Sequence, residues 1–307
     1  MKKGIVYKLS PFNNETDMSA LLYVIKKVLA FVLIYVVSAV LGEGVIIGIL
    51  YAMGYDPLNG IIPDANIGEL LPYYGFLIFS LVTLLYCRFV EKKKITFMSF
   101  KGIFTDYLLG TLLASGLLVI ITGIGCVCNS ITFLGFNTDV EVKSLVFWML
   151  AFVIQGYAEE IMCRGFLLNS LKIRISTLPA ILISSTVFVF PHLFSLMEED
   201  FVFTVVGIVN LYLISVILSA LVLWRSNIWS ACGLHSVWNF VLYAIMGLSL
   251  SGSECASEGV FLLQANDTSI LNGAEYGMEA SMITTVVLGV VAFIMIKRMG
   301  RIDNDGI

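Results

Sequence analysis

The chain has 307 residues and a formal net charge of −4, and 59% of its residues are apolar while only 13% are charged. A soluble protein carries about 25% charged residues, and no soluble core of this length hides so much apolar surface, so the composition points to a lipid bilayer as the main solvent. It argues against a soluble enzyme, a disordered chain and, because there is no basic excess, a nucleic-acid-binding protein.

Apolar stretches long enough to cross about 30 Å of hydrocarbon recur along the whole sequence. They are continuous rather than alternating, which favours helices over the strands of a membrane barrel. The sequence therefore predicts an all-α, polytopic membrane protein. We expect eight transmembrane helices, over Val28–Met53, Leu70–Val90, Tyr107–Val127, Leu145–Leu171, Leu178–Leu196, Phe201–Leu223, Ile228–Leu250 and Ala280–Ile296.

Basic residues flank these spans unevenly. Of the 18 Lys and Arg residues, all but Lys143 and Arg164 lie at span ends that the alternation assigns to one side, and the loops on the other side are mainly acidic. Because cytoplasmic loops are enriched in Lys and Arg, both termini are expected in the cytoplasm. Arg164 belongs to neither side, because it lies inside the fourth span.

The spans divide the chain into five parts. A cytoplasmic segment (1–27) precedes three accessory transmembrane helices (28–144), a core of four helices (145–250), an outer loop (251–279) and a final helix with a cytoplasmic tail (280–307). The outer loop is acidic and rich in Ser, Gly and Asn, so we expect it to be mobile.

The six cysteines carry little information. Most lie in or beside apolar runs, where Cys acts as a small hydrophobic residue, and there is no CxxC pair. Cys126 or Cys128 could form a disulfide with Cys255 on the outer side, although free thiols are the favoured interpretation.

The fourth span contains Glu159, Glu160 and Arg164 within six residues. Each isolated charge costs roughly 2.5–3.5 kcal/mol at the centre of a membrane helix, so three uncompensated charges would cost on the order of 9 kcal/mol. Glu160 and Arg164 are four residues apart and therefore share a helix face, where they can neutralise each other. Glu159 is turned about 100° away and is expected to lack a local partner.

The only two histidines lie in other spans. His192 follows Phe188 by four residues, with Pro191 able to bend the helix and free a backbone carbonyl. His235 and Asn239 are also four residues apart and present two polar groups on one stripe. A helix rises about 1.5 Å per residue, which gives the depth of each residue from the cytoplasmic end of its span. Glu159 lies roughly 20 Å deep, His192 roughly 21 Å and His235 at most roughly 15 Å. These similar depths allow the three side chains to converge.

Such a set suits hydrolysis. A buried Glu beside a His can deprotonate a water molecule, and a second His with an Asn amide can donate hydrogen bonds to a developing oxyanion. The chain has no Gly-x-Ser-x-Gly elbow, no His-Glu-x-x-His and no P-loop. A structural role for the polar groups, as links between helices, is the alternative.

These motifs resemble a known family. Glu159-Glu160-x-x-x-Arg164, Phe188-x-x-x-His192 and His235-x-x-x-Asn239 look like the three signature motifs of the CAAX-protease and bacteriocin-processing (CPBP) intramembrane proteases, in family order. The resemblance covers roughly residues 145–250. It implies an endopeptidase in a multi-pass membrane protein, located in the plasma membrane if the protein is bacterial. Its partners would be the lipid bilayer and a peptide or protein substrate reached within the membrane or from the cytoplasmic face.

The resemblance also implies roles. Glu159 would activate water, His192 would help to hold it, His235 and Asn239 would form the oxyanion hole, and Glu160 with Arg164 would be a supporting pair. No cofactor is favoured. Zinc is the alternative, because Glu159, His192 and His235 also fit a catalytic zinc set with an open fourth position.

Two other functions stay open at this point. The chain could be a non-catalytic bacteriocin self-immunity protein or membrane scaffold on the same fold. It could also be a transporter that uses the buried Glu and His residues as a proton relay. Glu43, a further intramembrane carboxyl between two glycines, is interpreted as a packing residue rather than a catalytic one.

Overall fold

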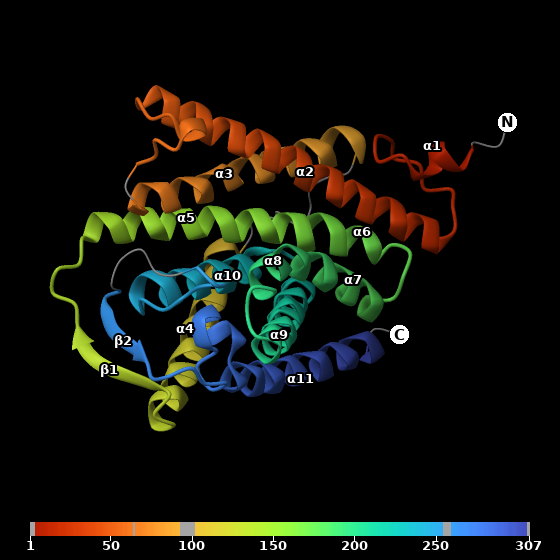
Figure 1. Ribbon diagram of the computed structural model, residues 1–307. Helices are drawn as coiled ribbons and strands as arrows, with labels where there is room; N and C mark the ends of the chain where they lie inside the picture. Colours follow the sequence, from red (N-terminus) through yellow and green to blue (C-terminus); the bar gives the residue numbers. More distant parts are fainter. Residues whose placement is uncertain (1–3, 64, 93–101, 254–258, 306–307) are drawn as a thin grey trace.

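The computed structural model describes residues 4–63, 65–92, 102–253 and 259–305, and these are largely helical (Figure 1). The elements are α1 (Ile5–Leu9), α2 (Ala20–Ala52), α3 (Ala65–Leu85), α4 (Ile103–Val127), β1 (Ile131–Phe136), α5 (Val142–Glu160), α6 (Asn169–Leu171), α7 (Thr177–Val189), α8 (Leu193–Leu196), α9 (Phe201–Arg225), α10 (Trp229–Phe240), β2 (Phe261–Ala265) and α11 (Met282–Asp305). π-Helical turns extend α3, α5 and α10 over Tyr86–Val90, Ile161–Leu168 and Val241–Ile245. Short 3₁₀ turns lie at Pro57–Asn59, Phe190–His192, Ala274–Tyr276 and Met278–Ala280.

Within the described ranges, seven helices are long and apolar enough to cross a membrane. They correspond to α2, α3, α4, α5 with its extension, α7 with α8, α9 and α11. This confirms the prediction of a polytopic helical membrane protein. The strands β1 and β2 depart from the all-α prediction and lie in segments that connect the long apolar helices.

The expected seventh span, Ile228–Leu250, has a different character from the others. It consists of the 12 residues of α10 followed by five π-helical residues, so it is short for a crossing of about 30 Å. Nearly every side chain of α10 is buried in protein rather than facing outward. The count of eight crossings, and the side on which the termini lie, therefore stay predictions.

The helices form two layers around α5 (Figure 1). The pair α2–α3 covers one face of α5, and α4, α7, α9, α10 and α11 form a bundle on the other. α10 packs against α4, α5 and α9. Because polar side chains are costly in contact with lipid, this central position shields the polar residues of α5 and α10.

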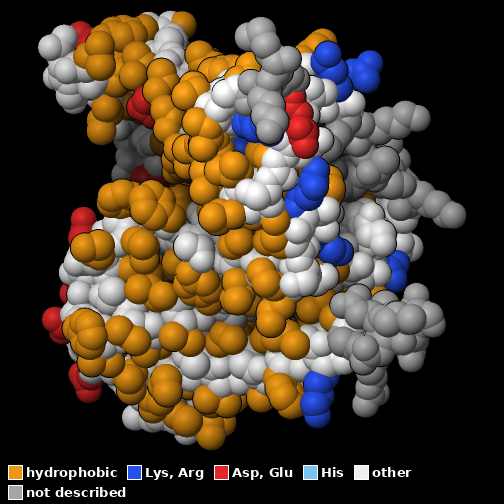
Figure 2. Space-filling view, turned by 90° about the vertical axis from the view of Figure 1, so that its right-hand side faces the viewer, with side chains coloured by type: hydrophobic (Ala, Val, Ile, Leu, Met, Phe, Trp, Pro, Cys, Tyr) orange, Lys and Arg blue, Asp and Glu red, His pale blue; other side chains and the backbone are white. Residues whose placement is uncertain are grey.

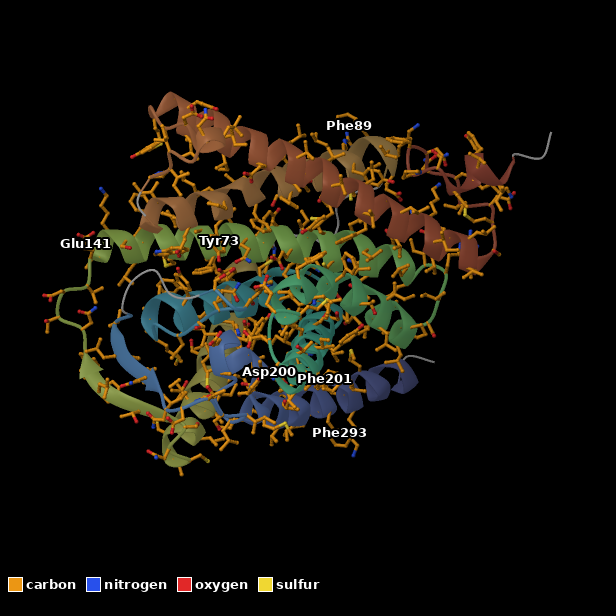
Figure 3. All side chains as sticks on the ribbon, in the orientation of Figure 1. Tyr73, Phe89, Glu141, Asp200, Phe201 and Phe293 are labelled. Atoms are coloured by element: carbon orange, nitrogen blue, oxygen red, sulfur yellow. The ribbon has the colours of Figure 1, made fainter. Side chains whose placement is uncertain are left out.

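The outer surface of the bundle is apolar. Figure 2 shows a broad hydrophobic surface with Lys and Arg toward one end and most Asp and Glu at the opposite edge. Phe89 and Phe293 point away from the bundle and are 69% and 59% exposed, whereas Tyr73 points toward its interior (Figure 3). α1 and the end of α11 lie at the same end of the molecule (Figure 1).

At the basic end, the segment before α2 is tied to several helices. Arg174 Nη2 donates to the Thr16 carbonyl at 2.7 Å, and Lys26 Nζ donates to Asn13 Oδ1 at 2.8 Å. Lys27 forms a buried ion pair with Glu91 at the end of α3. Both lysines are buried, Lys26 beside the segment that precedes α2 and Lys27 beside Glu91.

On the opposite side, β1 and β2 pair antiparallel, with Ile131 opposite Ala265 and Phe136 opposite Phe261. A bulge between Phe133 and Gly135 interrupts the ladder, and Gly135 takes the positive φ of 143° that such a bulge favours. The outer loop is therefore structured over much of its described length. The possible Cys255 disulfide lies outside the described residues, and Cys126 and Cys128 are free thiols.

Candidate active site

The ion pair expected on the fourth span lies at the centre of the bundle. Arg164 Nη1 donates to Glu160 Oε1 at 2.7 Å, and both side chains are fully buried. The helix changes from α to π directly after Glu160, and Arg164 lies within the π-helical turns. π-Helical turns inside longer helices often mark functional sites.

Arg164 links α5 to two neighbouring helices. Its Nη2 donates to Ser215 Oγ of α9 at 2.7 Å, and Ser215 in turn donates to Ser185 Oγ of α7 at 2.8 Å. The guanidinium lies 4.6 Å from the centre of the Phe188 ring, a cation–π contact. Charge and hydrogen-bond partners therefore contact both terminal nitrogens of this buried cation, as its low-dielectric position favours, while Nε has no hydrogen-bond partner among the described residues.

His235 of α10 contacts both carboxylates of the motif. Its Nδ1 lies 3.0 Å from Glu160 Oε1, and its Nε2 lies 3.9 Å from Glu159 Oε2. Because a carboxylate only accepts hydrogen bonds, Nδ1 carries a proton and donates it to Glu160. This bond fixes the ring and turns Nε2 toward Glu159, in the way that a carboxylate orients a catalytic imidazole.

Close helix packing fixes α10 in depth and rotation. A Cβ atom on Gly233 would lie 2.2 Å from the Tyr107 carbonyl oxygen, and one on Gly110 of α4 would lie 2.0 Å from the Ser230 carbonyl oxygen. On the α5 side, a Cβ on Gly156 would lie 2.6 Å from Ser236 Oγ. Small residues at membrane-helix interfaces allow such backbone approach, and here they bring α10 within reach of Glu159 and Glu160.

Asn227 anchors the start of α10. Its Oδ1 accepts the backbone N–H of Trp229 at 3.0 Å, and its Nδ2 donates to the buried carboxylate of Asp106 at the start of α4. Arg225 pairs with the same carboxylate. The N-terminus of α10 is thus fixed to both α4 and α9.

Glu159 has a local partner that the sequence analysis missed. Gln155, one turn earlier on α5, donates from Nε2 to Glu159 Oε1 at 3.2 Å. The expectation that Glu159 lacks a local partner is therefore wrong, because the i,i+4 rule applies to an amide as well as to a charge. Gln155 Oε1 also accepts from Asn239 Nδ2 at 3.1 Å, so it connects the first motif with the third.

His192 lies in a 3₁₀ turn between α7 and α8 rather than inside a continuous helix. Its Nδ1 lies 3.1 Å from the Phe188 carbonyl oxygen, and the two rings are 5.2 Å apart. The Phe188 ring is also 5.9 Å from the His235 ring. Pro191 lies in this turn, so the α-helical geometry is interrupted at the proline.

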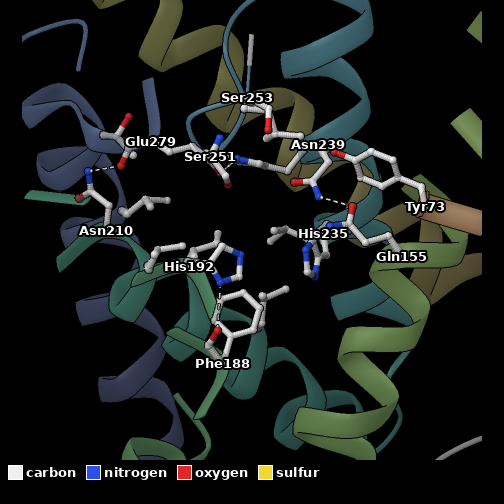
Figure 4. A pocket seen from close by; sticks show the side chains of 18 residues that line it. Tyr73, Gln155, Phe188, His192, Asn210, His235, Asn239, Ser251, Ser253 and Glu279 are labelled. Carbon is white, nitrogen blue, oxygen red and sulfur yellow. Dashed lines mark hydrogen bonds between the residues drawn. The ribbon is translucent and has the colours of Figure 1, made fainter. Parts of the chain in front are cut away.

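Two adjoining cavities bring these residues together. The larger, of about 220 Å³, is lined by Glu159 and His192 with a group of aromatic side chains from α2 and α3. The smaller, of about 110 Å³, is lined by His192, His235 and Asn239 (Figure 4). Gln155, Phe188 and His192 line both. A water molecule fills about 30 Å³ of liquid volume, so each cavity has room for water beside its polar groups.

The far end of the smaller cavity contains a carboxylate that the sequence analysis placed only in the outer loop. Glu279 Oε1 accepts from Trp238 Nε1 at 3.1 Å, and its Oε2 accepts from the Ser251 N–H and Oγ at 2.8 Å each. It therefore fixes the loop to α10 beside Asn239. No spacing rule in the sequence connects it to α10. Glu43, by contrast, lies on the exposed surface of α2 and lines neither cavity.

The proposed zinc set does not gather as a metal site. Within the described ranges no group of three or more His, Cys, Asp or Glu side chains is close enough to hold a metal ion. His235 and Glu159 approach to 3.9 Å, and His192 lines a cavity with each of them. The zinc alternative therefore stays a prediction.

Comparison with known protein families gives one match. Residues 141–241 match the family described as Rce1-like, type II CAAX prenyl endopeptidase. The matched segment contains all three motifs. No curated protein matches the chain. The match confirms the family resemblance over this third of the chain, and the family is one of proteases.

Proposed function

We propose that this Rce1-like chain is an intramembrane endopeptidase that hydrolyses a peptide bond with water activated by Glu159. The observation that carries the proposal is the convergence of Glu159, His192 and His235 from three separate helical segments. Glu159 approaches His235 to 3.9 Å and shares a cavity with His192.

Glu159 is suited to be the general base. Its side chain is 18% exposed and faces a cavity, while the neighbouring Glu160 is fully buried and already bonded to Arg164. His192 is suited to hold the water. The Phe188 carbonyl can only accept, so His192 Nδ1 carries the proton and Nε2 keeps a lone pair that accepts from water.

His235 and Asn239 supply the oxyanion donors. Since His235 Nδ1 donates to Glu160, its Nε2 becomes a donor only in the protonated ring. The two carboxylates and Arg164 leave one negative charge, which a protonated His235 cancels. The proposed resting charge of the cluster is therefore zero, as a buried site requires.

The reaction proceeds in two steps. Glu159 takes a proton from water while the water oxygen attacks the carbonyl carbon, and His235 Nε2–H and the Asn239 amide stabilise the oxyanion. The C–N bond then breaks as the carbonyl reforms, and Glu159 returns its proton to the leaving amine. No step needs a group outside these residues and one water.

The surroundings of Glu159 indicate where the substrate lies. Phe31, Tyr35, Phe76 and Phe79 line the larger cavity, so an apolar segment of the substrate fits there. We propose a peptide or protein substrate that is reached within the membrane or from its cytoplasmic face. The matched family's description makes a prenylated CAAX peptide the first substrate to test.

The test uses the purified full-length protein in liposomes with a quenched fluorescent CAAX peptide, farnesylated or unmodified. We expect Glu159→Gln and His192→Ala to lower cleavage at least about 100-fold, while Glu43→Gln, a matched change at an exposed intramembrane Glu, cleaves as the wild type does. If neither peptide is cleaved, the Glu159→Gln variant is used to capture substrates from cells, and the captured proteins replace the peptides in the cleavage assay. Full activity of Glu159→Gln would overturn the proposal and favour the scaffold or immunity function.

A second measurement addresses zinc. We expect cleavage to persist after exhaustive chelation, with no zinc found by elemental analysis of the active protein. Stoichiometric zinc, or activity that returns only when zinc is added back, would contradict the metal-free mechanism.

A further inference from the structure

Gln155 forms a second connection between the first and third motifs, beside the contacts that His235 makes with Glu159 and Glu160. It lies four residues before Glu159 on α5, on the face that looks toward α10. Its amide nitrogen contacts Glu159 Oε1 at 3.2 Å, and its amide oxygen contacts Asn239 Nδ2 at 3.1 Å. Figure 4 shows Gln155 and Asn239 joined in this way beside His235.

The chemistry of the partners fixes the direction of both bonds. An ionised Glu159 only accepts, so the Gln155 side chain must turn its NH₂ toward Glu159 and its oxygen toward Asn239. Asn239 must then turn its own NH₂ toward Gln155. One of its two N–H groups is used in this bond, and the other stays available beside His235.

We propose that Gln155 is a positioning residue that makes the charge on Glu159 dictate the orientation of Asn239. This inference rests on the proposed function. With Gln155 in place, one chain of hydrogen bonds links the ionised Glu159 to Asn239 and determines how the Asn239 amide is oriented in the oxyanion hole. Without it, the Asn239 amide can rotate by 180° and present its oxygen, which would repel the oxyanion.

The position of Gln155 between the cavities supports this role over simple packing. It lines both cavities, together with Phe188 and His192, and is half-buried. A residue that served only to join α5 to α10 would not need contact with either cavity, and Gly156 already provides close backbone packing between these helices.

The decisive experiment is a double-mutant cycle on cleavage, with rates normalised to folded, monodisperse protein. Gln155→Leu keeps the approximate size and removes both bonds. We expect it to lower kcat about 10- to 100-fold, with KM within about twofold of the wild type because leucine keeps the approximate side-chain volume and leaves the aromatic lining of the substrate cavity in place. Gln155→Glu keeps the acceptor for Asn239 but sets a second carboxylate against Glu159, and it is expected to lose activity as well.

Coupling separates positioning from a structural role. In an Asn239→Ala background, the further loss caused by Gln155→Leu should be at least about fivefold smaller than in the wild type, because the residue through which it acts is gone. The control Thr186→Val removes the 2.9 Å bond from Tyr212 between α9 and α7, away from the cavities, and should leave cleavage unchanged.

The outcomes distinguish the two proposals. If Glu159→Gln still cleaves, the proposed function fails. If Glu159→Gln is inactive but Gln155→Leu cleaves at the wild-type rate, or its effect simply multiplies with that of Asn239→Ala, the function stands and the positioning role of Gln155 is overturned.

Discussion

Replacing only Arg164 of the buried Glu160–Arg164 pair should destabilise the protein more than replacing both residues. Buried surface area and packing alone would predict the opposite order, because the double replacement changes more side chains. Arg164→Met leaves the Glu160 carboxylate, which is 0% exposed, without its partner at 2.7 Å. Breaking a buried pair in this way costs about 3–5 kcal/mol. In the double variant Glu160→Gln/Arg164→Met neither charge of this pair is left without its partner, and the remaining loss is that of hydrogen bonds, about 1–2 kcal/mol. The single variant should therefore be less stable than the double by about 2–3 kcal/mol.

Thermal unfolding in detergent measures this difference. We expect the single variant to unfold roughly 5–10 °C below the double variant. Lys172→Met, which removes an exposed positive charge near the end of the same helical segment, serves as the control and should match the wild type. The double variant should be folded but inactive, because His235 has lost the carboxylate that orients it. Equal unfolding temperatures for the single and double variants would refute the reasoning that charge imbalance dominates.

Three further predictions follow from the packing and topology. Gly233→Ala places a Cβ 2.2 Å from a carbonyl oxygen of α4 and should destabilise the protein by about 3 kcal/mol, whereas Gly116→Ala, with open space around it, should be neutral; urea unfolding compares them. Glu279→Ala removes the acceptor of three hydrogen bonds, so proteinase K should cut the outer loop several times faster than in the wild type, and an unchanged rate would argue against its role as an anchor. Green fluorescent protein fused to either terminus should fluoresce in bacterial cells, since both termini are expected in the cytoplasm; fluorescence from only one fusion would contradict this topology.

The membrane class and most helices could be predicted from the sequence, because long continuous apolar runs have few alternatives in a bilayer. α10 shows where that signal weakens. Its sequence contains Ser, Gly, Cys, His and Asn, and its helix is short and enclosed by protein on several sides. Hydropathy measures suitability for lipid, so it cannot reveal that a helix is surrounded by other helices instead.

The site could be predicted where partners share one helix and not where they meet across helices. Glu160 and Arg164 follow from their spacing, and Gln155 was within reach of the same rule had amides been considered. The contact of Glu279 with Trp238 could not be found in this way, because it joins residues 41 positions apart through a folded loop. Likewise, the role of Gly110 and Gly233 depends on which helices cross, which no local pattern reveals.

The placement of Glu160 and Arg164 on a single helical segment also has a consequence for biosynthesis. Ser215 and His235 are made after them, so neither is present when the ribosome delivers this segment to the insertion machinery. Two lone charges would then add roughly 5–7 kcal/mol to the transfer into lipid. A pair that closes within its own helix can enter the membrane as one neutral unit, and the later helices then need only assemble around it.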